Sequence, residues 1–219
     1  MKIAVVQLEL RPAPAQDVEA LVIAAARAAA AGADLIVLPD AAAVTEGPLR
    51  EELIRRLDDE VAAPSLVAGT DAEVVHDQIG GILVVTGDGC MDPVVLEALA
   101  AEAPSALVLA PASESELQAE AMLELAIGLS TSVSPLVIVA ETDGAEPGVG
   151  GHGGSAVVHL GEVVAEAIAG DDVLFADLVT PLGGPEPRGP LPQVPPLLAG
   201  RLASHAGRKL DVGYPADLG

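Results

Sequence analysis

Aromatic residues are almost absent from this sequence. Phe175 and Tyr214 are the only two, and there is no tryptophan. Hydrophobic residues still make up 51% of the 219 positions, which excludes an intrinsically disordered chain. A chain of this length can form one large domain with a substantial core. We therefore expect a core made of Ala, Val, Leu and Ile side chains.

Basic residues are also scarce. Ten Lys and Arg stand against 33 Asp and Glu, and the formal net charge is -23. A surface this negative repels phosphate backbones and anionic lipid headgroups. We therefore expect no nucleic-acid partner and no membrane partner, and we interpret the charge as a contribution to solubility rather than as an acidic binding function.

Cysteine occurs once, as Cys90, so no disulfide can form within the chain. A chain without disulfides suits a reducing compartment. The first residues lack the apolar core and cleavage site of a signal peptide. Apolar runs are interrupted before they reach the roughly 20 residues that a membrane helix needs. These absences predict a cytoplasmic protein.

Signals for a metal or a cofactor are weak. The four histidines are scattered along the chain and form no cluster with the cysteine, so we expect no metal site. Residues 148–153 match the letters G-x-G-x-x-G. A dinucleotide site needs that loop to begin a helix, whereas a strand pattern follows it here. We expect no cofactor.

Strand and helix patterns alternate through the first two thirds of the chain, and closely spaced strands follow. Helices are expected over residues 17–32, 49–61, 93–102, 113–129 and 197–206, the fourth capped by the pair Ser113 and Glu116. Strands are expected over residues 3–10, 33–40, 65–69, 81–86, 106–110, 136–140, 155–160, 162–167 and 173–178, with a hairpin turn at Leu160 and Gly161. This order predicts a layered α/β sandwich rather than a purely parallel sheet.

The opening of the chain resembles the nitrilase, or carbon–nitrogen hydrolase, superfamily. Residues 3–8 read I-A-V-V-Q-L, and after a helix residues 32–40 read G-A-D-L-I-V-L-P-D. The superfamily reads A-x-x-Q, a helix, then G-A-D-L-I-V-x-P-E. Each motif is moderately specific, and their order and spacing together make the assignment.

Two later stretches carry the same resemblance. Residues 154–158 and 161–167 are similar to the superfamily's hairpin G-S-x-I-I-x-P-x-G-x-V-L-A-E-A. Residues 93–100 and 107–111 are similar to the helix and strand that follow its nucleophile. In all, the resemblance covers most of residues 1–178.

The resemblance implies a four-layer αββα sandwich over residues 1–178. Residues 179–219 then form a Pro- and Gly-rich extension that packs on this domain or on a dimer partner. Members commonly pair, which implies a homodimer that buries the helices over residues 93–102 and 117–129. They cleave nitriles, amides or ureido compounds through a thioester on a Cys, with a Glu as the base and a Lys that stabilises the tetrahedral intermediate.

The catalytic set that the resemblance implies is incomplete. The superfamily's Glu falls on Asp40, which keeps the carboxylate but is one methylene shorter. Asp40 is equally well interpreted as a loop residue that caps a neighbouring turn. The Lys has no counterpart, because no lysine lies between Asp40 and Cys90. The cations in that interval, Arg50, Arg55 and Arg56, share a predicted helix with glutamates and are interpreted as a solvated surface.

Two alignments remain open for the nucleophile. Cys90 is the only thiol, and alignment on it pairs Cys90 with Asp92 as in the superfamily's C-x-D. Alignment on Pro93 keeps the following helix in register and moves the nucleophile position upstream to about Gly87. The second alignment is slightly favoured, and Cys90 is then a loop or core thiol.

Other marks of the superfamily are also changed. The helix that usually carries R-A-x-E-N reads L-S-T-S-V over residues 129–133, and Glu141 stands near the usual Asn at the end of the next strand. The missing Arg and Glu exclude the buried ion pair that braces the site in the superfamily.

Three hypotheses for function follow. The first is a divergent nitrilase-like protein that has lost hydrolysis and acts in binding or assembly. The second is an active hydrolase of a small amide, nitrile or carbamoyl compound that uses Cys90 and Asp40, with backbone N–H donors in place of the Lys. The third is an unrelated α/β domain that binds a ligand. The missing Lys favours the first.

Overall fold

The computed structural model describes residues 1–40, 47–69, 72–144, 151–167, 169–179 and 190–211. Its helices are α1 (Pro14–Ala30), α2 (Pro48–Glu60), the 3-10 helix η1 (Gly87–Met91), α3 (Pro93–Glu102), α4 (Glu116–Ser132) and α5 (Pro196–Asp211). Its strands are β1 (Lys2–Glu9), β2 (Leu35–Leu38), β3 (Ser65–Val67), β4 (Ala72–His76), β5 (Gly80–Thr86), β6 (Ala106–Ala110), β7 (Leu136–Val139), β8 (Thr142–Asp143), β9 (Ala156–His159), β10 (Glu162–Glu166) and β11 (Asp172–Asp177).

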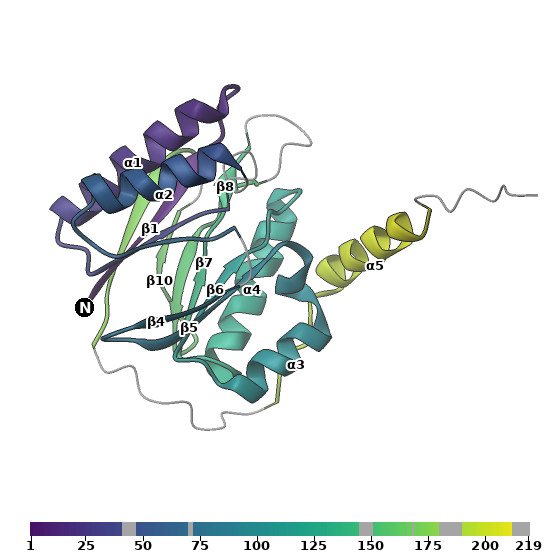
Figure 1. Cartoon of the computed structure of the whole chain (residues 1–219). Helices are drawn as coiled ribbons and strands as arrows, with labels where there is room; N and C mark the ends of the chain where they lie inside the picture. Colours follow the sequence, from purple (N-terminus) through teal and green to yellow (C-terminus); the bar gives the residue numbers. More distant parts are fainter. Residues whose placement is uncertain (41–46, 70–71, 145–150, 168, 180–189, 212–219) are drawn as a thin grey trace, which may run out of the picture.

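The strands form two sheets that face each other (Figure 1). In the first sheet the order is β11-β1-β2-β3, with β8 beside the end of β1. In the second the order is β10-β9-β7-β6-β5-β4. Strands β1 to β3 run parallel, and so do β5 to β7, so the carboxyl ends within each set lie at one edge of their sheet. These edges are where α/β folds place their sites.

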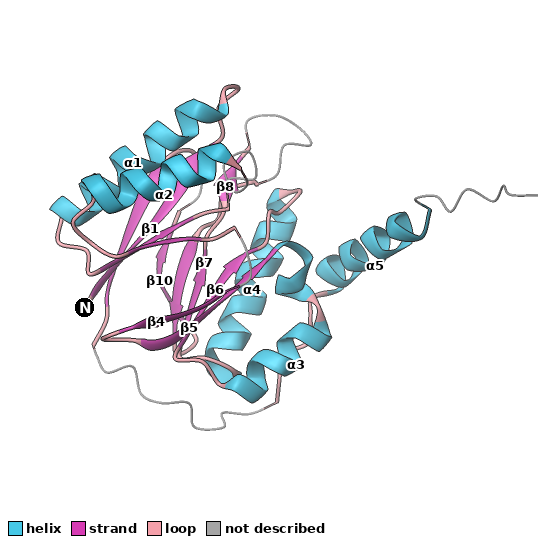
Figure 2. Cartoon of the chain, in the orientation of Figure 1, coloured by secondary structure: helices cyan, strands magenta, loops and turns pink. Residues whose placement is uncertain are grey.

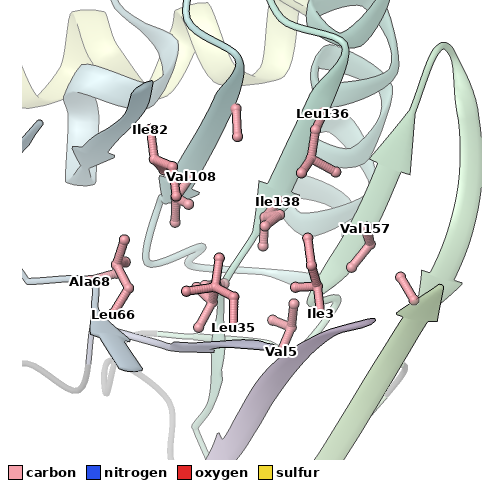
Figure 3. Packing of buried hydrophobic residues seen from close by; sticks show 14 of the residues in the cluster. Ile3, Val5, Leu35, Leu66, Ala68, Ile82, Val108, Leu136, Ile138 and Val157 are labelled. Carbon is pink, nitrogen blue, oxygen red and sulfur yellow. The ribbon is translucent and has the colours of Figure 1, made fainter. Parts of the chain in front are cut away.

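Apolar side chains fill three layers. The layer between the sheets includes Val37. It also includes Ile3 and Val108, which are labelled in Figure 3, and all three side chains are fully buried. A second layer lies between the first sheet and helices α1 and α2 and includes Leu38. A third lies between the second sheet and helices α3 and α4. Figure 2 shows the two helix pairs on opposite sides of the sheets. The predicted αββα sandwich is confirmed, and Val37 and Leu38 of β2 are fully buried in two different layers.

Most element predictions hold to within a few residues, and the hairpin turn is confirmed. Leu160 and Gly161 both have positive φ, 54° and 86°, as a two-residue turn between β9 and β10 requires. Strands β4 and β8 were not predicted. The predicted cap of α4 was wrong, because the cap is Ser115, whose side chain accepts a hydrogen bond from the backbone N–H of Gln118. Ser113 instead donates hydrogen bonds to Glu141.

The described part of the C-terminal extension lies against the second sheet's helices. Leu191, Val194 and Leu202 pack on the third apolar layer, and Leu198 is fully buried within it. Whether this extension also contacts a dimer partner stays a prediction. Within the described ranges, no helix combines the length and the apolar character needed to cross a membrane.

Candidate functional site

The predicted nucleophile position lies in η1, directly after β5. Gly87 begins this turn with a φ of 54°, and Cys90 follows within it. The Cys90 side chain is fully buried, and its Sγ donates a hydrogen bond to the carbonyl oxygen of Val85 at 3.2 Å. It belongs to the apolar layer between the second sheet and α3 and α4. The thiol therefore faces the helix side of its sheet.

The predicted base lies on the other sheet. Asp40 follows the end of β2, whose strand belongs to the first sheet. Its side chain is half-buried. The structure thus places Asp40 and Cys90 after strands of different sheets, and the catalytic roles of both residues stay predictions.

Arg55 and Arg56, two of the three arginines between these residues, form ion pairs at the surface, as predicted. Arg55 pairs with Glu52 and Asp59 on α2. Arg56 pairs with Glu60 on the same helix and with Glu19 of α1. Because these guanidinium groups are held by surface carboxylates, they are poor candidates for stabilising an oxyanion at η1.

A buried carboxyl that the sequence did not assign lies at the carboxyl ends of β6 and β7. Glu141 is 2% exposed and stands where the chain passes from β7 of the second sheet to β8 of the first. The Ser113 hydroxyl donates a hydrogen bond to Glu141 Oε1 at 2.5 Å, and the Ser113 backbone N–H donates to the same oxygen at 3.0 Å. Ala112, with a φ of 51°, turns the chain that presents both donors.

The environment of Glu141 raises its pKa to about 7. Burial is the main cause, because it penalises the charged form. The two hydrogen bonds from Ser113 and the positive charge of Arg201 act in the opposite direction. This carboxyl therefore gains and loses its proton near neutral pH.

Two further buried polar residues join Glu141 to the first sheet. The Glu141 backbone N–H donates to Ser155 Oγ at 3.0 Å, and that hydroxyl lies 3.1 Å from the Glu141 carbonyl oxygen, to which it donates. The Ser155 N–H donates to Gln7 Oε1 at 2.9 Å, and Gln7 Nε2 donates to the carbonyl of Gly170 at 3.1 Å. We call Gln7, Ser113, Glu141 and Ser155 the edge cluster.

Helix α5 covers the neighbouring part of this edge. Arg201 is 8% exposed and donates hydrogen bonds to the carbonyl of Pro111 and to Gln118 Oε1, at 3.1 and 3.3 Å. It also lies 3.5 Å from Asp88 of η1. One turn later, His205 lies between Asp88 and Glu114, at 2.9 and 3.2 Å. The C-terminal helix thus places two basic side chains over the turn that holds Cys90.

A small cavity of about 100 Å³ lies beside the start of α4. Its polar lining is Glu116, Glu120, His152 and Glu166. Pockets that hold a small-molecule ligand usually measure about 300–1,000 Å³, so this space suits water rather than a substrate. In the part of the chain that the structure describes, no group of three or more His, Cys, Asp or Glu residues is arranged to hold a metal.

Sequence reasoning named Asp40 and Cys90 as catalytic candidates and noted Glu141 only as a residue near the superfamily's usual Asn, so it missed the buried contacts of Glu141. The one signal in the sequence for this buried site was that a carboxylate, Glu141, stands near the position where the superfamily usually has Asn. Arg201 and His205 lie in the C-terminal extension, for which the resemblance offers no motif. Their spacing of four residues places both on one face of a helix, and this was the only local signal.

Solved structures with the same fold include an amidase from Nesterenkonia sp. AN1. A double mutant of it in complex with acrylamide superposes with a TM-score of 0.63 at 19% identity, covering 82% of this chain and 91% of the other. A second mutant shows Michael addition of acrylamide at the active-site cysteine. It superposes with a TM-score of 0.62 at 18% identity, covering 95% of this chain and 99% of the other. A third mutant is described as an amidase from the nitrilase superfamily. It superposes with a TM-score of 0.63 at 19% identity, covering 81% of this chain and 90% of the other.

These structures show that the chain has the nitrilase-superfamily fold. Neither a protein-family model nor a curated protein sequence matches it. At identities of 18–19%, the likeness is one of fold.

Proposed function

We propose that this chain is a nitrilase-fold protein that has lost all or most hydrolysis of carbon–nitrogen bonds and acts in binding or assembly. The observation that carries the proposal is the position of the one thiol. Cys90 is fully buried on the helix side of the second sheet, with its Sγ bonded to the Val85 carbonyl. A nucleophile needs a base within hydrogen-bond reach and an open path to substrate.

The expected loss of rate is large. Removal of one donor to the oxyanion typically raises the barrier by about 2.7–4 kcal/mol. Here the superfamily's Lys is missing from the sequence between Asp40 and Cys90, and the base is one methylene shorter. Reacting atoms must also approach to roughly 3–3.5 Å, which the thiol does not allow while it is buried against the helices.

Hydrolysis tests this proposal directly. Wild type and Cys90→Ala are compared on a panel of small amides, nitriles and carbamoyl compounds, with ammonia release as the readout. We expect both proteins to give the background rate. Mass spectrometry after incubation with acrylamide should show no adduct on Cys90. Turnover in wild type that disappears in Cys90→Ala would overturn the proposal.

The alternative function is an active amidase or nitrilase-type hydrolase that uses Cys90 and Asp40. It is favoured by the neighbouring structures, which are amidases with a reactive cysteine. Backbone N–H groups of Gly87 and Gly89 beside Cys90 would then serve as donors in place of the Lys. An Asp40→Asn variant that lost turnover together with Cys90→Ala would establish this second function.

The assembly part of the proposal is a homodimer in the cytoplasm, with a small amide-like compound as a possible ligand. Helix α3 leaves Val94 74% exposed, and α4 leaves Leu117 64% exposed. We expect these helices to pair with those of a second copy and bury both side chains. Sedimentation at micromolar concentration should give the mass of a dimer, and Val94→Lys should shift it toward a monomer. A wild-type monomer would contradict this prediction.

A further inference from the structure

We propose that α5 is an intramolecular latch that closes over η1 and shields Cys90. The inference concerns the burial of the thiol and does not depend on the loss of hydrolysis. It follows from which face of α5 is buried, from the partners of that face, and from one close contact that holds the segment leading into the helix.

One narrow face of α5 is in contact with the domain. Leu198, Arg201, Leu202 and His205 recur at the spacing i, i+3, i+4 and i+7, and all four are buried or half-buried. The remaining described side chains of the helix, including Leu197, are exposed. A helix attached along one short face can open locally while the rest of the domain stays folded.

The apolar part of that face covers the layer that contains the thiol. Leu198 is fully buried in the same cluster as Cys90, Met91 and Leu96. Helix α5 also packs directly on η1 and on α4. Helix α5 therefore covers part of the apolar layer that contains Cys90.

The polar part of the face is attached to the same turn. Asp88, two residues before Cys90, lies 3.5 Å from Arg201 and 2.9 Å from His205. Arg201 also donates to the Pro111 carbonyl at 3.1 Å, and its Nε, also buried, has no hydrogen-bond partner among the described residues. A buried cation with one unsatisfied donor makes the closed state less stable than a fully paired one. These contacts fit a latch that opens and closes rather than a permanently fixed helix.

The segment before α5 is held by a close fit at Gly128. A Cβ added at Gly128 of α4 would lie 2.6 Å from Pro192 Cβ, so the two segments cannot keep their positions with a larger residue there. By contrast, a Cβ added at Gly200 of α5 would have no heavy atom within 4 Å. The two glycines therefore offer a matched pair of variants. Gly128→Ala should disturb the docking of the segment that leads into α5, and Gly200→Ala should leave that docking unchanged.

The test is the rate at which iodoacetamide labels Cys90 in the full chain under native conditions, followed by intact mass. We expect Gly128→Ala to raise the rate by about tenfold, because Pro192 must move to relieve the overpacking. Asp88→Asn should also raise it, because it removes the carboxylate that faces Arg201 and His205. In Gly200→Ala, Cys90 should be labelled no faster than in wild type. Ala has a higher helix propensity than Gly, and its methyl group would have no heavy atom within 4 Å.

Hydrogen exchange distinguishes local opening from general destabilisation. In Gly128→Ala and Asp88→Asn we expect faster exchange in α5, with β1 and β6 exchanging as in wild type. Labelling rates equal to wild type in both variants would overturn the latch. Faster labelling together with faster exchange in β1 and β6 would overturn it as well, because Cys90 would then be exposed by global unfolding.

Discussion

As the pH rises from below 4.5 to above 7, wild type should lose on the order of 3 kcal/mol of unfolding free energy relative to Glu141→Gln. In the unfolded chain, Glu141 loses its proton near the ordinary glutamate value of 4.5, whereas in the folded protein burial raises its pKa to about 7. Between these values the folded state binds more protons than the unfolded state, so stability falls as the pH rises. The contribution is fully present below pH 4.5 and is lost through pH 7.

The measurement is urea unfolding at a series of pH values from 4 to about 8.5, with the difference between the two proteins as the readout. Gln keeps the shape of the side chain and an oxygen that accepts from Ser113, but it does not titrate. The pKa of Asp17 is also raised, mainly by burial. Because Asp17 is present in both proteins, its effect cancels. The exposed Glu97→Gln serves as the control and should follow wild type, whereas parallel curves for wild type and Glu141→Gln would refute the assignment.

Local patterns predicted most of the fold because its strands are short apolar runs with clear boundaries. Residues 35–38 and 106–110 are buried along their whole length, and such runs stand out without any periodicity. Strand β4 was missed because residues 72–76 read A-E-V-V-H, which is too short and mixed to be recognised alone. It becomes a strand through antiparallel pairing with β5, which is a tertiary effect.

The cap of α4 shows why a local motif can point to the wrong residue. Ser113 with Glu116, and Ser115 with Gln118, both match the pattern of Ser followed three residues later by Glu or Gln. The choice between them depends on Glu141, which is 28 residues away from Ser113 in the chain. The hydroxyl and the backbone N–H of Ser113 both donate hydrogen bonds to Glu141. Ser115 is then left to cap the helix.

The candidate site was harder to predict than the fold for the same reason. Its positions could be matched along the chain, but the direction in which Cys90 points depends on packing in the third apolar layer. Helix α5 also brings distant residues to the site. Arg201 is 83 residues away in the sequence from its partner Gln118, and His205 is 117 residues away from its partner Asp88. No pattern within a single segment contains that information.

Replacing Gln7 with Leu should lower the free energy of unfolding by about 2–4 kcal/mol. Gln7 is 1% exposed and belongs to β1 of the first sheet. Its side chain accepts from the N–H of Ser155 and donates to the carbonyl of Gly170. Leu has a similar volume but no polar atoms, so both groups lose their partner. A buried polar group left unpaired typically costs about 1–3 kcal/mol.

The two orphaned groups should not contribute equally. Ser155 is fully buried, whereas Gly170 is half-buried and can turn its carbonyl toward water. The greater part of the loss should therefore come from the Ser155 N–H, whose hydrogen exchange should accelerate more than that of neighbouring amides in β9. Gln78→Leu, in the exposed turn between β4 and β5, is the matched control and should change stability by no more than about 0.5 kcal/mol. Similar stability in wild type and Gln7→Leu would mean that the hydrogen bonds of Gln7 do not hold the two sheets together at the edge cluster.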